Sequence, residues 1–156
     1  MTWFLYWTGT HVDDGDKYLR SFTSQIAPFC GSKEKCSQFG SKDALKEAKR
    51  NVEKYYAVVG VAEEMENSMV VFEKYIPKYF KNALRFYHEF MRDTENQGMN
   101  KNIFQPPRIP QYIISHLMKN FSLEIDFYTF CKARLHQQYI TLLWSIYIKF
   151  RQIKLW

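Results

Sequence analysis

Apolar residues recur at helical spacing in residues 41–55 and again in residues 62–76. Steps of three and four residues place such side chains on one face of a helix, so both segments are predicted to be helices. Glutamates at the start of the second segment favour a helix N-terminus there, and Pro77 is expected to end or kink the helix. A further helical pattern follows from residue 78 to about residue 91. The apolar positions are Ala44, Ala48, Val52 and Tyr55, then Met65, Met69, Phe72 and Ile76.

Two more apolar stripes at helical spacing occupy residues 113–146 and predict that one or two helices close the chain. Residues 1–28 have no sustained period and are predicted to be irregular. Residues 92–111 are polar and contain three prolines, which predicts one long loop. The stripes consist of Ile113, Ile114, Leu117, Met118 and Phe121, followed by Ile125, Tyr128, Cys131, Leu135, Tyr139, Leu142 and Ile146.

The short run Tyr56–Val61 is β-branched and nearly uninterrupted. Such a run is typical of a strand buried on both faces, although a buried helical turn gives the same pattern. Its position between two helical patterns favours a strand. A lone strand leaves backbone groups without partners, so the rest of its sheet is expected to lie outside this sequence. The predicted fold class is therefore α/β, mostly helical with one buried strand in this chain.

Composition narrows the class of protein. The 156 residues are 46% hydrophobic and 18% aromatic, with few glycines and prolines, which excludes disordered and collagenous chains. Lysine and arginine exceed aspartate and glutamate by 22 − 16 = +6, which favours a polyanionic partner such as nucleic acid, anionic lipid or sulfated glycan. No apolar run approaches the roughly 18 residues of a membrane span.

Two cysteines, Cys30 and Cys36, are separated by five residues that include glycine, serine and charges. This spacing suits a small disulfide-closed loop, and the residues alone leave two free thiols equally open. The spacing differs from the common zinc half-site, so no metal site is predicted. Cys131 falls within an apolar helical stripe and is predicted to be a core residue.

Four cations, Lys74, Lys78, Lys81 and Arg85, recur in steps of four, three and four residues. They share one helical face if the helix passes Pro77 with only a kink, and that face suits a linear polyanion. A simple solvated surface is the alternative. The aromatic residues among these cations fall at core spacing, so no nucleic-acid platform is predicted.

No catalytic residue is assigned. The four histidines lack a nucleophile or metal-ligand partner at a recognisable spacing, and no phosphate-loop or metalloprotease motif is present. The acidic run at residues 63–66 could supply general acid and base carboxylates, but carboxylates in the first turn of a helix are more often caps.

Residues 25–140 together resemble the C-terminal part of the heparan sulfate and uronyl 2-O-sulfotransferases. The resemblance lies in the combination of short motifs rather than in any one of them. The motifs are Phe29-Cys30-Gly31 with Cys36, Ala48-Lys49 with Asn51, Val59-Gly60-Val61 with Glu63-Glu64-Met65-Glu66, Pro77 with Tyr79-Phe80, and Glu124 with Asp126-Phe127-Tyr128.

The resemblance implies transfer of a sulfuryl group from PAPS to the 2-hydroxyl of a uronic acid in heparan, dermatan or chondroitin sulfate. It implies a P-loop-type sulfotransferase fold, a Golgi type II membrane protein, a homotrimer, and an oxidising compartment in which Cys30 and Cys36 form a disulfide. In the family, the phosphate-binding loop, the catalytic His and the membrane anchor all lie N-terminal to the matched region. The chain is therefore expected to be a fragment that is inactive alone.

The resemblance also implies residues for binding the donor. Tyr87 falls where the family has a Tyr near the cofactor, and Asn100, Lys101 and Asn102 lie in the polar part of the following loop. The substrate glycan is assigned to the four-cation face. Residues 1–24 are predicted to be an irregular segment, 25–140 part of a sulfotransferase domain, and 141–156 an apolar tail. The alternative function is a non-catalytic lumenal module that binds sulfated glycans through the same basic face.

Overall fold

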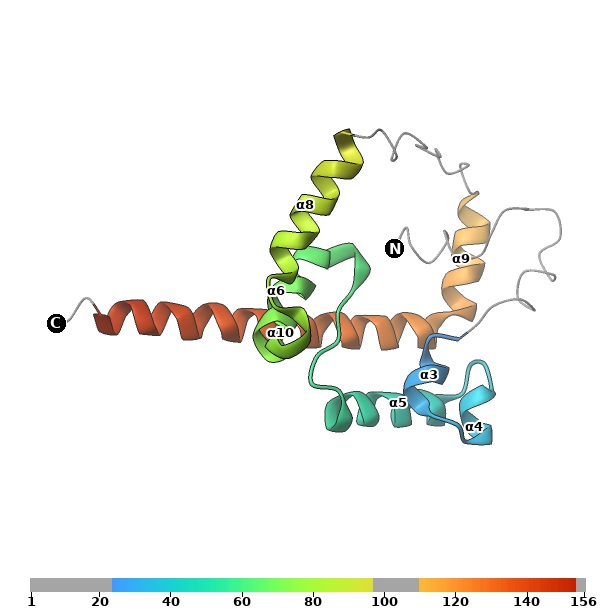
Figure 1. Cartoon of the computed structure of the whole chain (residues 1–156). Helices are drawn as coiled ribbons and strands as arrows, with labels where there is room; N and C mark the ends of the chain where they lie inside the picture. Colours follow the sequence, from blue (N-terminus) through green and yellow to red (C-terminus); the bar gives the residue numbers. More distant parts are fainter. Residues whose placement is uncertain (1–23, 97–109, 154–156) are drawn as a thin grey trace.

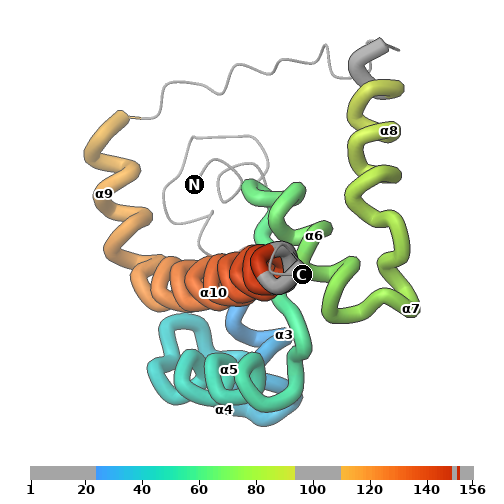
Figure 2. The backbone as a smooth tube through the Cα atoms, turned by 90° about the vertical axis from the view of Figure 1, so that its left-hand side faces the viewer, coloured from blue at the N-terminus to red at the C-terminus, as the bar shows by residue number. Residues whose placement is uncertain are grey.

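The computed structural model describes residues 24–96 and 110–153, and this part of the chain is mainly helical. Its longest element is α10 (Ser122–Ile153), and the other helices pack around the N-terminal half of α10 (Figures 1 and 2). Helices α3 to α5 lie on one side of α10, and α6 to α8 lie on another. None of the helices in the described ranges is long and apolar enough to cross a membrane.

The first group contains α3 (Ile26–Cys30), α4 (Glu34–Ser37) and α5 (Lys42–Tyr55). Helix α5 confirms the first predicted helix, and the Ser41 hydroxyl caps it by accepting a hydrogen bond from the Ala44 amide at 3.2 Å. A disulfide between Cys30 and Cys36 joins α3 to α4, as the resemblance implied. Because α3 begins at Ile26, the prediction of irregular structure up to residue 28 is wrong for its last three residues.

A buried glutamate fastens α3 to α10. The Glu124 carboxylate accepts hydrogen bonds from the backbone N–H groups of Gln25 at 3.0 Å and Ile26 at 3.2 Å, and from the Ser24 hydroxyl. These amides lie at the N-terminus of a helix, where no intrahelical partner exists for them. The carboxylate is 98 residues distant from Ile26 in sequence, so this cap is a tertiary contact.

The segment of residues 56–61 is extended, but the described residues contain no strand, so the predicted buried strand is not shown. The backbone is satisfied by side chains instead. Arg134 and Gln138 of α10 donate to the carbonyls of Tyr56 and Ala57 at 3.0 and 2.7 Å. The described part of the chain is therefore helical, and it does not show the α/β sheet or the P-loop fold that the sequence predicted.

The second group begins with the 3-10 turn η1 (Ala62–Glu64) and α6 (Met65–Tyr75), which confirm the second predicted helix. The chain then breaks twice, before α7 (Pro77–Phe80) and before α8 (Ala83–Asn96). Pro77 starts α7 because its ring favours the first position of a helix. At the second break Asn82 adopts a positive φ of 61°, so residues 74–85 do not form the single helix that one cationic face required.

Helix α9 (Gln111–Asn120) and α10 (Ser122–Ile153) complete the described chain, in agreement with the prediction of one or two closing helices. The core consists of two clusters along α10. Phe127 and Cys131 pack with α3, α4 and α5, whereas Leu135 and Leu142 pack with Val61 and Val71. Cys131 is a core residue, as predicted. Ile146 is 46% exposed, so the predicted apolar stripe extends past the end of the core.

Candidate functional site

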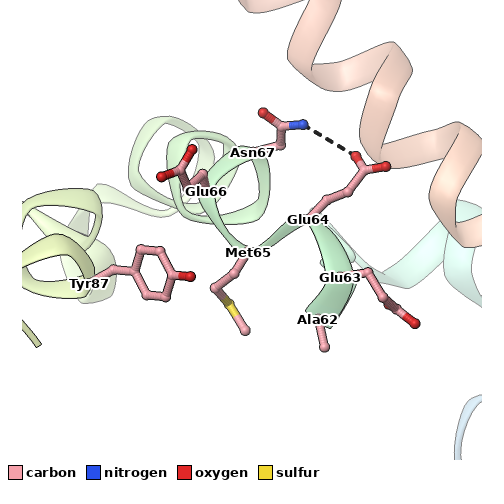
Figure 3. A pocket seen from close by; sticks show the side chains of 7 residues that line it. All are labelled: Ala62, Glu63, Glu64, Met65, Glu66, Asn67 and Tyr87. Atoms are coloured by element: carbon pink, nitrogen blue, oxygen red, sulfur yellow. Dashed lines mark hydrogen bonds between the residues drawn. The ribbon is translucent and has the colours of Figure 1, made fainter. Parts of the chain in front are cut away.

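A polar hollow of about 380 Å³ lies where the start of α6 meets α8. Tyr87 comes from α8, and its ring points toward the start of α6, while Glu64 points the other way, toward α10 (Figure 3). The hollow is lined by Ala62, Glu63, Glu64, Met65, Glu66, Asn67 and Tyr87. It includes the one described residue that the resemblance assigned to the cofactor.

Glu64 joins this hollow to α10 through Lys132 and His136. Its Oε1 lies 2.8 Å from Lys132 Nζ, and its Oε2 lies 2.5 Å from His136 Nε2. The hydrogen bond from Lys132 lowers the pKa of Glu64 to about 2, while partial burial opposes this and bonds from His136 and Asn67 support it. The same hydrogen bond raises the pKa of Lys132. Glu64 is therefore a structural anion, and its side chain does not cap α6 as first-turn glutamates were expected to do.

The charge of the hollow decides what it can bind. Three of its seven lining residues are glutamates, and Lys132 and His136 are directed at Glu64. A sulfonate or phosphate placed here would meet carboxylates of the same charge. The residues around Tyr87 do not fit the phosphate groups of PAPS. Among the described residues, no three His, Cys, Asp or Glu side chains are arranged to hold a metal ion.

The four predicted glycan-binding cations lie on separate elements. Lys74 is in the last turn of α6, Lys78 is in α7, Lys81 follows α7, and Arg85 is in α8. All four are exposed. Arg85 forms an ion pair with Glu89 at 3.2 Å, and Lys78 lies over the ring of Tyr79, 5.5 Å from its centroid. The premise of one helical face is wrong, and the assignment to glycan binding stays a prediction.

The remaining predictions concern the cofactor-binding loop and the C-terminal boundary of the sulfotransferase domain. Asn100, Lys101 and Asn102 fall in residues 97–109, which lie outside the described residues. Helix α8 continues to Asn96, so the prediction of a loop over residues 92–111 is wrong for its first five residues. The boundary predicted at residue 140 falls inside α10, which continues unbroken to Ile153.

Sequence reasoning missed the contact of α10 with residue 64. Lys132 and His136 are four residues apart, so they share one helical face, and Glu64 is the acid that meets them. The spacing of Lys132 and His136 was readable in the sequence. Their partner was not, because residues 64 and 136 are brought together only by packing of α6 against α10.

The chain is similar to curated sulfotransferases. It is 41% identical over 115 residues, 73% of its length, to the uronyl 2-sulfotransferase homolog pip of Drosophila melanogaster, of which the match covers 22%. Human uronyl 2-sulfotransferase is 30% identical over 71% of the chain and 27% of the relative. Heparan sulfate 2-O-sulfotransferase 1 of Gallus gallus is 31% identical over 68% of the chain and 29% of the relative. No family model matches the chain, and no solved structure is significantly similar to it.

These relatives are sulfotransferases, which is the class that the motif combination predicted. The chain belongs to the family of uronyl and heparan sulfate 2-O-sulfotransferases. It spans less than a third of the length of these relatives.

Proposed function

We propose that this chain forms part of a glycosaminoglycan uronyl 2-O-sulfotransferase, in which upstream sequence supplies the catalytic machinery. The observation that carries the proposal is the 41% identity to a uronyl 2-sulfotransferase homolog over 73% of the chain. The substrate is a uronic acid in heparan, dermatan or chondroitin sulfate, and its 2-hydroxyl is the acceptor. PAPS supplies the sulfuryl group when bound.

Within such an enzyme, this chain supplies a structural scaffold and contacts to the donor and the glycan. The core along α10 holds the α6–α8 group in place, and the disulfide holds the α3–α4 corner. Because the hollow beside Tyr87 is acidic, we propose that Tyr87 contacts only an uncharged part of the nucleotide, where an aromatic ring can stack. Lys101 and the amides of Asn100 and Asn102 have the chemistry to bind phosphate oxygens. None of the chain's histidines is proposed as the general base.

The cellular setting follows from the same resemblance. We propose a Golgi enzyme with an N-terminal anchor in the longer protein, and a homotrimer as its assembled form. The Cys30–Cys36 disulfide is consistent with an oxidising compartment. The four exposed cations of α6 to α8 are proposed to contact the glycan chain.

A chimera tests the proposal. The aligned residues of this chain replace their counterpart in the Drosophila melanogaster relative, and transfer of labelled sulfate from PAPS to a glycosaminoglycan acceptor is measured. We expect the chimera to transfer sulfate and the isolated 156-residue chain to transfer none. A matched chimera carrying Leu135→Asp, which puts a charge into the core, controls for folding. A folded chimera without transfer contradicts the proposed role, and sustained transfer by the isolated chain contradicts the view that it is a fragment.

A further inference from the structure

An N-glycosylation sequon lies where α9 meets α10. Asn120, Phe121 and Ser122 form the pattern Asn-X-Ser, in which X is any residue except proline. Among the asparagines of the sequence, Asn120 is the only one followed two positions later by serine or threonine. Such a pattern accepts a glycan where the chain enters the secretory pathway and the asparagine stays on the surface of the fold. Two features of this chain meet those conditions.

The turn between the two helices leaves both ends of the sequon accessible. Helix α9 ends at Asn120, and the Phe121 amide then donates to the Leu117 carbonyl at 2.9 Å. Phe121 is buried, and its ring packs edge to face against Phe39 with the centroids 5.1 Å apart. The middle residue therefore fixes the corner to the rest of the fold, while Ser122 is exposed and Asn120 is only half-buried.

The Asn120 side chain can carry a glycan without losing its present contact. Its Nδ2 lies 2.9 Å from Nε2 of His116, one turn earlier on α9, and this contact is on the protein surface. N-glycosylation replaces one of the two hydrogens on Nδ2. The remaining N–H can still donate to the ring nitrogen of His116, so the modification does not require α9 to rearrange.

The surface around the sequon is mostly polar. His116 and Lys119 are exposed within one turn of Asn120, and Asp126 is exposed one turn after Ser122, whereas Met118 is the apolar exception at 39% exposed. A hydrophilic glycan is compatible with such a surface. Figure 2 shows α9 and the α6–α8 group on different sides of α10, so the attachment point is apart from the candidate hollow.

The disulfide supplies the second condition. Cys30 and Cys36 are joined in the structure, and structural disulfides persist in oxidising compartments such as the lumen of the endoplasmic reticulum. Oligosaccharides are transferred to asparagine in that same lumen. The disulfide and the sequon belong to separate parts of the chain, and neither depends on which sugar receives sulfate.

We propose that Asn120 carries an N-linked glycan. Its Nδ2 attacks the anomeric carbon of a lipid-linked oligosaccharide, so that a nitrogen–carbon bond forms and the carbon–oxygen bond to the lipid pyrophosphate breaks. Nδ2 gives up one proton to a base of the transferring enzyme, and the lipid pyrophosphate leaves as an anion. The finished glycan covers the α9–α10 corner. This proposal rests on the lumenal setting of the proposed function and does not depend on sulfate transfer.

Expression of the full 156-residue chain behind a cleavable signal peptide in animal cells tests the proposal. We expect a glycosylated form that peptide N-glycosidase F converts to the mobility of the unmodified chain. The enzyme leaves an aspartate at the modified position, which peptide mass spectrometry should locate at residue 120. Cleavage of the signal peptide shows that the chain has reached the lumen.

Substitutions within the sequon make the test specific. Asn120→Gln and Ser122→Ala should each lose the glycan completely, whereas Ser122→Thr keeps the required hydroxyl and should retain it. Ser115→Ala is the matched control, because Ser115 is an exposed serine of α9 outside the sequon, and it should also retain the glycan. Transfer takes place on the entering chain before it folds, so a folding defect in a variant does not mimic loss of the acceptor.

The chimera with the Drosophila melanogaster relative extends the test to a longer protein. There, Asn120→Gln should remove one glycan and leave sulfate transfer unchanged. An unmodified Asn120 in the secreted chain, an unmodified Asn120 in the chimera, or a glycan that persists in Asn120→Gln would each overturn the proposal. A glycosylated chimera that transfers no sulfate would support this site and contradict the proposed function, so the two failures are distinguishable.

Discussion

The Ser68 hydroxyl takes the place of a neighbouring strand for Val61. Its Oγ accepts a hydrogen bond from the Val61 amide at 3.1 Å, and its single proton has two acceptors in reach, the Glu64 carbonyl at 2.9 Å and the Val61 carbonyl at 3.2 Å. Both residues are buried, so these backbone groups have no water to bind. This side chain on α6 therefore satisfies the buried Val61 amide without a neighbouring strand.

Replacing Ser68 by alanine should destabilise the fold. The change leaves the buried amide of Val61 without a partner, which costs about 1–3 kcal/mol in the free energy of unfolding. Urea denaturation followed by circular dichroism measures the effect. Ser115→Ala is the matched control, because the Ser115 hydroxyl is exposed and donates only to a carbonyl in its own helix. Equal stability of Ser68→Ala and the original chain would contradict the role of this hydroxyl.

Gly60 should not tolerate a side chain. A Cβ atom built there would lie 2.7 Å from the Phe72 ring and 3.0 Å from Ser68, closer than packed atoms allow. Gly60→Ala should therefore lower the free energy of unfolding by about 1–3 kcal/mol. The contact with the ring is tested by adding Phe72→Leu, which shortens the opposing side chain. Thermal unfolding of both single variants and the double variant completes a double-mutant cycle. Gly60→Ala should lower the free energy of unfolding by less in the Phe72→Leu background than in the original chain. If the two changes in free energy are strictly additive, contact with the ring is not the cause.

Glu64 should make stability depend on pH at the acidic end. Its folded pKa of about 2 lies below the ordinary 4.5, so its ionised form stabilises the folded state above about pH 4.5, and this is lost as the pH falls through 2. The Lys132 side chain is 37% exposed, so water screens its ion pair with Glu64. Glu64→Gln should therefore lower the free energy of unfolding by only about 1–2 kcal/mol at neutral pH. The difference in the free energy of unfolding between Glu64→Gln and the original chain should shrink below pH 4.5.

Urea unfolding at several pH values between 2 and 7 measures this dependence. Glu53→Gln, an exposed glutamate on α5, is the control and should follow the original chain at every pH. A constant difference between Glu64→Gln and the original chain across that range would show that ionisation of Glu64 is not responsible.

The Cys30–Cys36 disulfide should stabilise the α3–α4 corner. It closes a short loop, and in the chain-entropy model such a loop contributes about 2 kcal/mol. The variant Cys30→Ala with Cys36→Ala should unfold at lower urea concentration than the oxidised chain. Adding reductant should destabilise the original chain and leave the double variant unchanged. If reductant changes both equally, the effect does not come from this bond.

The exposed cations of α7 and its C-terminal flank should contribute to glycan binding. Lys78→Ala with Lys81→Ala is expected to weaken binding of the chain to heparin by about tenfold, or ~1.4 kcal/mol, because two charges that face a polyanion are removed. Isothermal titration calorimetry at fixed salt measures the affinity. Lys42→Ala with Lys46→Ala removes two exposed lysines from α5 and is the matched control. Equal losses of heparin affinity in both double variants would mean that binding depends only on net charge.

Local patterns in the sequence determined most of the helices. The apolar steps of three and four residues located α5 and α6, and Pro77 marked the end of α6, because each depends only on neighbours along the chain. The two cysteines and the motif string identified the disulfide and the family. None of these features requires knowledge of what a residue meets across the fold.

Tertiary packing decided what the local pattern left ambiguous. The run at residues 56–61 has the composition of a strand, yet side chains of Arg134, Gln138 and Ser68 satisfy its backbone, and those residues are seven or more positions away. The four predicted glycan-binding cations are separated because the helix breaks before Pro77 and again at Asn82, where φ is positive. The pKa of Glu64 is lowered chiefly by its hydrogen bond with Lys132 of α10. Hydrogen-bond partners and charges distant in sequence set these outcomes, and no local period encodes them.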